Sequence, residues 1–330
     1  MPETNSQRFA VGIDVGATKT ASVLITPEGE IIAQHYSPTN ALGDENTAFE
    51  TIVEHIKRYQ DEFSDHLIGI GIGAPGWHDL EAGIINKAVN LGWDQFNIVQ
   101  AIQEKCSLSI PILHQTDALA ETLGEYYYGA AKNCSDFAYL GVGSGLGSGF
   151  FCNNQLVTGH NGMAGSIGHY AFGTTQDVCV CGLHGCIEQR VGGIALCTML
   201  EENSDEVLAR SILRKEDLCD ARAVLAAARD HDDLAVHVFA EMGKWLGVAM
   251  SMYITLLNPK MIVIGGGLGK AAYQLFVPAA LEEVRKRTLP IFWKGVEIKK
   301  SSVRTSAMGA ACLVWEYDQK EVMPIKQKHE

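Results

Sequence analysis

The sequence lacks the features of a membrane protein and of a nucleic-acid binder. No apolar stretch is long and clean enough to span a bilayer, and the longest candidate, 235–257, carries His237, Glu241 and Lys244. The polar N-terminus has no apolar core of a signal peptide. The formal net charge is −13, whereas nucleic-acid binders normally show a basic excess. We therefore expect a cytoplasmic protein with a small-molecule substrate, no nucleic acid and no membrane partner.

The sequence also lacks the cysteine pattern of a disulfide framework. The chain has 9 cysteines, and three of them crowd into Cys179–Cys186. Without a secretion signal, this pattern predicts one metal cluster and otherwise reduced thiols. The six scattered cysteines are Cys106, Cys134, Cys152, Cys197, Cys219 and Cys312.

What is present fits a globular α/β chain. The 330 residues are 47% hydrophobic, enough for two domains or one large one. An apolar strand at 9–14 runs into a glycine turn and a second strand, and the same opening recurs at 137–142. This repeat predicts a duplicated α/β fold with a cleft between the halves. A last helix near 306–317 could pack back on the first half.

The first candidate site is Asp14-Val15-Gly16-Ala17-Thr18-Lys19. Here the turn N–H groups, Thr18 and Lys19 can face phosphate oxygens, and Asp14 can face the accompanying Mg²⁺. A plain hairpin turn with a solvated Asp and Lys explains the motif equally well. Its spacing is not that of the Walker phosphate loop.

Two further glycine segments follow strands. The segment 141–147 has glycine at alternate positions, around Gly143, Ser144 and Gly145, and can expose its N–H groups to a ligand. The second, Gly265, Gly266 and Gly267, follows a buried strand, and a flat ligand such as adenine could lie against it. A flexible turn and a helix entry turn are the respective alternatives.

One histidine and three cysteines form the strongest motif. His169, Cys179, Cys181 and Cys186 have the chemistry of a tetrahedral Zn²⁺ site, and four protein ligands would make the ion structural. His184 is a rival fourth ligand inside the tight 181–186 loop. The other interpretations are core thiols with a lone histidine, or a zinc-knuckle nucleic-acid module, which the acidic charge disfavours.

Asp117 follows a short strand and opens a helix. A helix N-cap is the ordinary role of such a residue. A general base that takes a proton from an attacking hydroxyl is the functional one.

Together these residues resemble the ROK family of sugar kinases and related repressors, part of the actin-like ATPase superfamily. The resemblance runs from Val11 to about Ala311. It is most specific at 159–188, where 164–169 (AGSIGH) and 179–188 (CVCGLHGCIE) are similar to the family's zinc-and-sugar motif. Segments 73–76 and 90–93 are similar to its sugar-side segments.

The resemblance implies an α/β fold of two actin-like ATPase (ribonuclease H-like) domains flanking a cleft. We expect a smaller domain at 1–116 plus 306–330, and a larger one with the zinc motif at 117–305. The implied activity is that of a glucokinase-like hexokinase, which transfers the γ-phosphate of ATP to the terminal hydroxyl, C6, of a hexose. ATP, Mg²⁺ and a structural Zn²⁺ are the implied cofactors, and a homodimer is the implied assembly.

The resemblance also assigns residues to roles. Asp117 is the implied general base, and His169 would offer one ring nitrogen to zinc and the other to a sugar hydroxyl. The implied ATP and phosphate residues are Asp14, Gly16, Thr18, Lys19, Gly143, Ser144, Gly145, Gly265, Gly266 and Gly267. The implied sugar residues are Gly76, Asn90, Thr116, Asp117, Ser166, His169 and Glu188.

Two positions depart from the family pattern. Ser166 stands where the family usually has Glu, and Thr116 stands where it usually has Asn. Because a polar site that lacks a partner discriminates sharply, we expect a substituted hexose or amino sugar as an alternative to glucose. A sugar-sensing protein without turnover is a further alternative. Too few residues precede Asp14 for the helix-turn-helix of the repressors, so we expect no DNA-binding domain.

Overall fold

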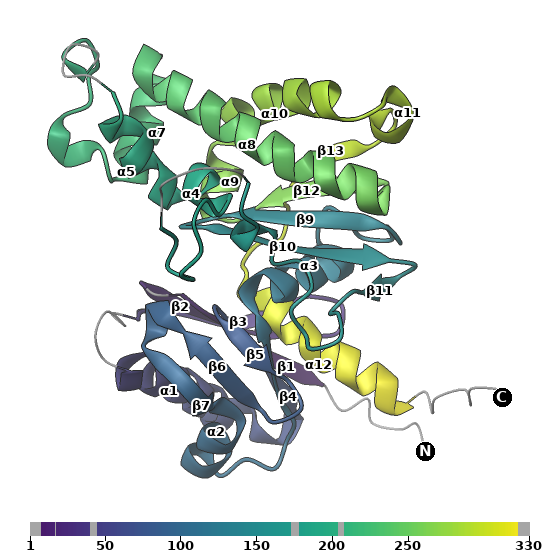
Figure 1. The fold of residues 1–330 in the computed structure, drawn as a ribbon. Coiled ribbons are helices and arrows are strands. Elements are labelled where there is room, and N and C mark those ends of the chain that lie inside the picture. The colour runs from purple at the N-terminus through teal and green to yellow at the C-terminus, as the bar shows by residue number, and fades with distance from the viewer. Residues whose placement is uncertain (1–7, 17, 40–44, 173–177, 204–207, 323–330) are drawn as a thin grey trace. The chain divides into compact units, whose positions relative to one another are not determined.

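The chain divides into two compact units. The computed structural model describes residues 8–16, 18–39, 45–172, 178–203 and 208–322 (Figure 1). The first unit comprises residues 1–133, 158–164 and 302–330, and the second comprises 134–157 and 165–301. The expected boundary before Asp117 differs from this division. Helix α3 (Asp117–Tyr128) belongs to the first unit, because it packs against β4 (Leu67–Ala74) and α12 (Ala307–Val322).

The first unit is built on a five-stranded sheet of order β3-β2-β1-β4-β8. Strands β3, β2 and β1 pair antiparallel and form a meander, whereas β1, β4 and β8 pair parallel. A separate three-stranded sheet, β5-β6-β7, follows β4 in the chain. The remaining bounds are β1 Phe9–Val15, β2 Lys19–Ile25, β3 Ile31–Pro38, α1 Glu45–Phe63, β5 Trp77–Asp79, β6 Ile84–Ala88, β7 Trp93–Asn97, α2 Ile98–Cys106 and β8 Ile112–Thr116.

The second unit repeats this plan. Its sheet has the order β11-β10-β9-β12-β13, again an antiparallel meander followed by two parallel strands. The duplication that the two similar glycine turns predicted is therefore present in the topology. The bounds are β9 Phe137–Val142, β10 Leu146–Cys152, β11 Gln155–Leu156, α4 Glu188–Val191, α5 Gly193–Glu201, α7 Ala221–Arg229, α8 Asp233–Leu257, β12 Met261–Gly265, α9 Gly267–Ala271, α10 Tyr273–Arg287, α11 Pro290–Trp293 and β13 Glu297–Lys300.

Glycines on two neighbouring strands let a helix approach the first sheet closely. A Cβ on Gly12 would overlap the backbone oxygen of Ala307, and one on Gly71 would overlap that of Ala310. Helix α12 accordingly packs against β1 and β4 (Figure 1, yellow). The predicted return of the last helix to the first half is confirmed.

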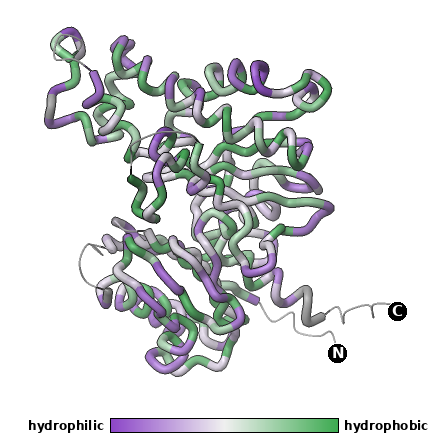
Figure 2. Tube along the Cα trace, viewed as in Figure 1, coloured by the Kyte–Doolittle hydropathy of each residue, from purple (hydrophilic) through white to green (hydrophobic). Residues whose placement is uncertain are grey.

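In the second unit, α8 and α10 pack together at small residues. A Cβ on Gly243 or Gly247 of α8 would press on backbone oxygens of α10. Along α10 hydrophobic and hydrophilic colours alternate (Figure 2), as expected for a helix that buries one side, here at Phe276, Ala280 and Val284. None of the helices in the described part of the chain is long and apolar enough to cross a membrane.

One expectation about the cysteines is wrong. Cys197 on α5 and Cys219, just before α7, form a disulfide, with their Cα atoms 4.6 Å apart. The other scattered cysteines are free. The two partners are 22 residues apart in the sequence, and only the fold of the second unit brings them together.

Candidate functional site

The predicted site residues fall in both units. In the first unit, Asp14 lies near the carboxyl end of β1 and is half-buried. The Ser306 hydroxyl, which directly precedes α12, donates a hydrogen bond to Asp14 Oδ2. Burial raises the pKa of Asp14 to about 6, and the charge of Asp117 adds to the rise. The bond from Ser306 and the charge of Lys19 oppose it. A cation bound close to Asp14 would stabilise the charged form of this carboxylate.

The turn after Asp14 is a tight hairpin connection. The Gly16 N–H donates to the Lys19 carbonyl oxygen at 3.0 Å, and the Thr18 carbonyl accepts from Thr39 N–H at 3.0 Å. Thr18 and Lys19 are exposed, whereas Ala17 lies outside the described residues. The turn therefore presents the side chains of Thr18 and Lys19 to solvent in the same unit as Asp14.

Asp117 is the first residue of α3, and it is not the helix cap. The Thr116 hydroxyl oxygen accepts the N–H of Leu119 at 3.4 Å and so caps the helix. The Asp117 carboxylate accepts the neighbouring Ala118 N–H at 2.8 Å. The residue keeps accessible surface, yet the protein atoms around its carboxyl displace enough water to raise its pKa, with the N–H groups of Ala118 and Asp117 opposing.

The turn after β4 carries Gly76. Its φ of 118° lies in the region that favours glycine, and a Cβ there would overlap the Lys87 carbonyl oxygen on β6. Asn90 lies in the short 3₁₀ turn Val89–Leu91 and is exposed, whereas the nearby Leu91 and Trp93 are buried. Both residues belong to the unit that holds Asp117.

In the second unit, the glycine loop between β9 and β10 rests on the start of α5. The Gly193 N–H donates to the Gly143 carbonyl at 2.8 Å, and Ile194 N–H donates to the Ser144 carbonyl at 3.0 Å. A Cβ on Gly145 would overlap the carboxylate of Glu188. A Cβ on Gly143 would meet nothing within 4 Å, so this glycine leaves open space at its surface.

The turn Gly265, Gly266 and Gly267 is fixed by a tyrosine that the sequence did not indicate. The Gly266 N–H donates to the Tyr139 hydroxyl at 3.0 Å, and a Cβ on Gly265 would overlap the Tyr139 ring. Gly266 has φ 74°. At Gly267 a Cβ would again meet nothing within 4 Å, so the turn has an open side.

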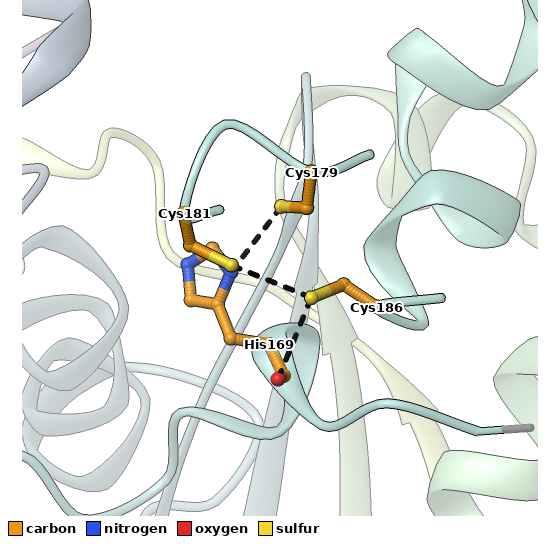
Figure 3. A group of neighbouring side chains, drawn as sticks. All are labelled: His169, Cys179, Cys181 and Cys186. Atoms are coloured by element: carbon orange, nitrogen blue, oxygen red, sulfur yellow. Dashed lines mark hydrogen bonds between the residues drawn. The ribbon is translucent and has the colours of Figure 1, made fainter. Parts of the chain in front are cut away.

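The four predicted zinc ligands gather in one group. One donor atom from each of His169, Cys179, Cys181 and Cys186 lies within 4.8 Å of the others. The Cys181 and Cys186 sulfurs are 3.5 Å apart, and the Cys179 sulfur is 3.7 Å from His169 Nδ1. In Figure 3 the three sulfurs and the imidazole point toward one another. The exposed rival His184 is not part of the group.

Burial disfavours the deprotonated, thiolate form of these cysteines when no cation is bound beside them. It raises the pKa of Cys179 well above its usual range, and it raises that of Cys186 to about 11. Tetrahedral zinc with bonds of about 2.3 Å to sulfur would separate its sulfurs by about 3.8 Å. The observed spacings and the donor set therefore fit this ion.

Two other sugar candidates adjoin the four ligands. The Glu188 carboxylate lies 3.0 Å from the Cys179 sulfur and 3.3 Å from His169 Nδ1. Ser166 is exposed, and it directly follows Gly165, whose φ is 90°.

Two hydroxyl groups hold the backbone at Gly165, directly before Ser166. The Ser148 hydroxyl donates to the Gly165 carbonyl oxygen and lies 2.7 Å from the Tyr253 hydroxyl. Sequence reasoning missed Ser148 and Tyr253, as it missed Ser306 and Tyr139, because each acts on a segment remote in the sequence.

Within each unit, the structure brings predicted residues together. Asp14 and Asp117 interact electrostatically in the first. In the second, Glu188 contacts both the glycine loop and the group around His169. The glycine turns and the repeated strand order fit an α/β fold of the actin-like ATPase class.

Comparison with known proteins gives the family. The sequence profile described as "ROK family" matches residues 10–317, so the chain belongs to the ROK family. A glucokinase of Halalkalibacterium halodurans is 32% identical over 311 residues, which cover 92% of this chain and 93% of that protein. The DNA-binding transcriptional dual regulator NagC of Escherichia coli (strain K12) is 27% identical, over 94% of this chain and 76% of NagC.

The fold matches solved ROK structures as well. A ROK family glucokinase from Streptomyces griseus, solved in complex with glucose and AMPPNP, superimposes with a TM-score of 0.78. It is 25% identical, and the match covers 93% of this chain and 99% of that one. The relatives therefore support a ROK sugar kinase, and they include repressors.

Proposed function

We propose that this chain is an ATP-dependent sugar kinase that transfers the γ-phosphate to the terminal, C6, hydroxyl of a hexose. The similarity to a glucokinase over 93% of that protein's length supports the reaction class. Phosphoryl transfer asks the protein mainly for positioning and for charge stabilisation.

Asp117 carries the proposal. Thr116 already caps α3, so helix formation does not require a carboxylate at 117. The raised pKa of Asp117 makes its carboxylate a stronger proton acceptor than a solvated one. In the proposed reaction it accepts the proton of the sugar hydroxyl as that oxygen attacks phosphorus and the bond to ADP breaks.

The phosphate side is assigned to the hairpin turn and the glycine segments. Asp14 would hold Mg²⁺, directly or through water, and the cation would offset the cost of its buried charge. Thr18 and Lys19 would contact phosphate oxygens. The remaining assignments to ATP are Gly16, Gly143, Ser144, Gly145, Gly265, Gly266 and Gly267.

The sugar side is assigned to residues of both units: Gly76, Asn90, Thr116 and Asp117 of the first, and Ser166, His169 and Glu188 of the second. Ser166 and Thr116 have shorter side chains than the Glu and Asn that are usual at these positions in the family, so each can offer fewer hydrogen bonds to a sugar. A substituted hexose or amino sugar is therefore the substrate class that we propose over glucose.

We further propose that His169, Cys179, Cys181 and Cys186 hold a structural Zn²⁺. The ion would close its coordination shell with protein ligands and would fix the direction of the His169 ring. Metal analysis of the purified protein should find about one zinc per chain. Cys181→Ser should lose it, whereas the control Cys152→Ser, at a free thiol on β10, should keep it. A chain that purifies without zinc and binds none when it is added would refute the assignment.

A sugar-sensing protein without turnover is the second candidate, because NagC and other repressors are among the relatives. A coupled assay of ADP release separates the two. Asp117→Asn should lower kcat by about a hundredfold or more, the usual contribution of a general base. The matched control Asp61→Asn, on the exposed side of α1, should leave kcat unchanged. Equal ADP release by Asp117→Asn and the parent protein would refute the assigned base.

The same assay tests the substrate class. The panel comprises glucose, mannose, N-acetylglucosamine and N-acetylmannosamine, each with MgATP. We expect the highest kcat/KM with a sugar that carries a substituent. A clear preference for free glucose would contradict the proposed substrate class, whereas the kinase assignment would still stand.

A further inference from the structure

Two buried histidines of the first unit have no role in the proposed chemistry. His78 lies on β5, directly after the turn that carries Gly76, and His114 lies on β8, three residues before Asp117. They are 1% and 6% exposed. Their Nδ1 atoms are 2.9 Å apart, and their rings stack with centroids 5.1 Å apart. Two imidazoles buried face to face need a specific protonation pattern to be stable.

The contacts fix this pattern. His78 Nε2 is 3.1 Å from the Ala74 carbonyl oxygen, which can only accept, so Nε2 carries a proton. In a neutral ring, His78 Nδ1 must then accept, and the donor is the Nδ1–H of His114. Burial keeps both rings neutral: it lowers the pKa of His114 to about 4, and, with the charge of His114, that of His78 to about 3.

The hydrogen bonds therefore run in one direction, from His114 through His78 to the backbone at Ala74. Ala74 is the last residue of β4, and it pairs with Thr116 at the end of β8. His114 lies beside Ile72 in the same pair of strands. The two histidines thus link the strand that leads to Asp117 with the turn that leads to Gly76.

The turn has little freedom once this link is made. Gly76 is confined on its other side by the Lys87 backbone of β6. His78 itself pairs with Ile85 of β6, which anchors β5 in the small sheet. Loss of the bond to Ala74 would leave residues 74–76 held only at their ends.

We propose that His114 and His78 are positioning residues that hold the turn 74–76 against Thr116 and Asp117, and so set the affinity for the sugar. This rests on the proposed function, in which Gly76, Thr116 and Asp117 face the sugar. Neither histidine touches the substrate. The pair acts through the backbone at Ala74.

Matched variants separate this role from plain core packing. In His78→Gln the side-chain amide can place an N–H where Nε2 stood, whereas in His78→Asn it is too short to reach Ala74. We expect His78→Asn to weaken sugar binding about tenfold, the loss of about one buried hydrogen bond, with the KM for ATP unchanged. His78→Gln should restore most of the affinity. His114→Leu removes the donor that orients the His78 ring but leaves the bond to Ala74 possible, so it should weaken sugar binding no more than His78→Asn. The double variant should lose no more than His78→Asn, because the bond to Ala74 is lost only once.

Three measurements make the result decisive. Calorimetry gives the Kd of the best-bound sugar of the panel, steady-state kinetics gives the separate KM values, and hydrogen exchange reports on the peptide 73–79. We expect faster exchange at 74–78 in His78→Asn but not in His78→Gln, even without sugar. Equal exchange and affinity in both variants would overturn the proposal, as would a parallel rise of the sugar and ATP KM values. A protein that binds sugar but releases no ADP would refute the kinase assignment alone.

Discussion

At the scale of residues, the proposed role of Asp14 conflicts with its contribution to stability. Its pKa is about 6 in the folded chain, against 3.8 for an ordinary Asp. Between these values the folded state holds a proton that the unfolded state releases, so this residue's contribution to stability falls as pH rises from about 4 to about 6. Above pH 6 the folded state therefore carries an unfavourable charge. A Mg²⁺ ion at Asp14 would remove that cost.

Asp14→Asn should therefore stabilise the protein at pH 7.5 without Mg²⁺, by on the order of 1 to 3 kcal/mol, and should not stabilise it at pH 4. The same variant should lose kinase activity. Urea unfolding at the two pH values measures the difference, with Asp61→Asn as the neutral control. A variant that is less stable than the parent at pH 7.5 would show that the carboxylate is compensated by groups other than a bound cation.

The sequence indicated candidate site residues, but it did not indicate the residues that hydrogen-bond to them. The grouping of His169 with three cysteines could be predicted from the sequence because the cysteines share one local motif. Asp117 was singled out only by its place in the whole family pattern, and its role is a proposal. Ser306 was not indicated, since its bond to Asp14 joins positions 292 residues apart. Tyr139 and Tyr253 look like ordinary apolar core residues in the sequence. Only the fold shows that their hydroxyls bond to Gly266 and Ser148.

At the scale of elements, periodicity predicted most strands and helices, but not their partners. The strands at the two glycine turns and the last helix α12 lie where the apolar patterns placed them. The small sheet β5-β6-β7 was not predicted, because its short strands lack a clear alternation of buried residues. The disulfide between α5 and the turn before α7 escaped prediction because cysteine spacing does not define connectivity.

The disulfide gives a prediction about the second unit. Closing a loop of this length should stabilise the folded state by about 3 kcal/mol in the chain-entropy account. A reductant should therefore lower the Tm of the parent protein, but not that of the double variant Cys197→Ser/Cys219→Ser. Cys152→Ser, at a free thiol, should respond to the reductant as the parent does. An unchanged Tm of the parent on reduction would count against the bond.

At the scale of the whole molecule, the first unit is discontinuous in the sequence. Its last helix, α12, follows the entire second unit and packs on the glycine-lined face of β1 and β4. A chain that stops after Ser301 should therefore lose order in the first unit rather than in the second. Hydrogen exchange should show lost protection in peptides from β1 and β4, and retained protection in β12.

A chain that stops after Val322, which leaves α12 entire, is the matched control and should keep protection in both units. If β1 stays protected without α12, the helix is dispensable for the first sheet. If β12 loses protection as well, the two units unfold as one cooperative body.

The position of α12 also has a consequence for biosynthesis. A ribosome releases the strands of the first sheet long before the helix that covers them, and the whole second unit emerges in between. During that interval the bare glycine-lined face of β1 and β4 is open to other apolar chains. We therefore expect chaperones to bind the newly made first unit before α12 is synthesised. The second unit can fold as soon as its own strands are complete.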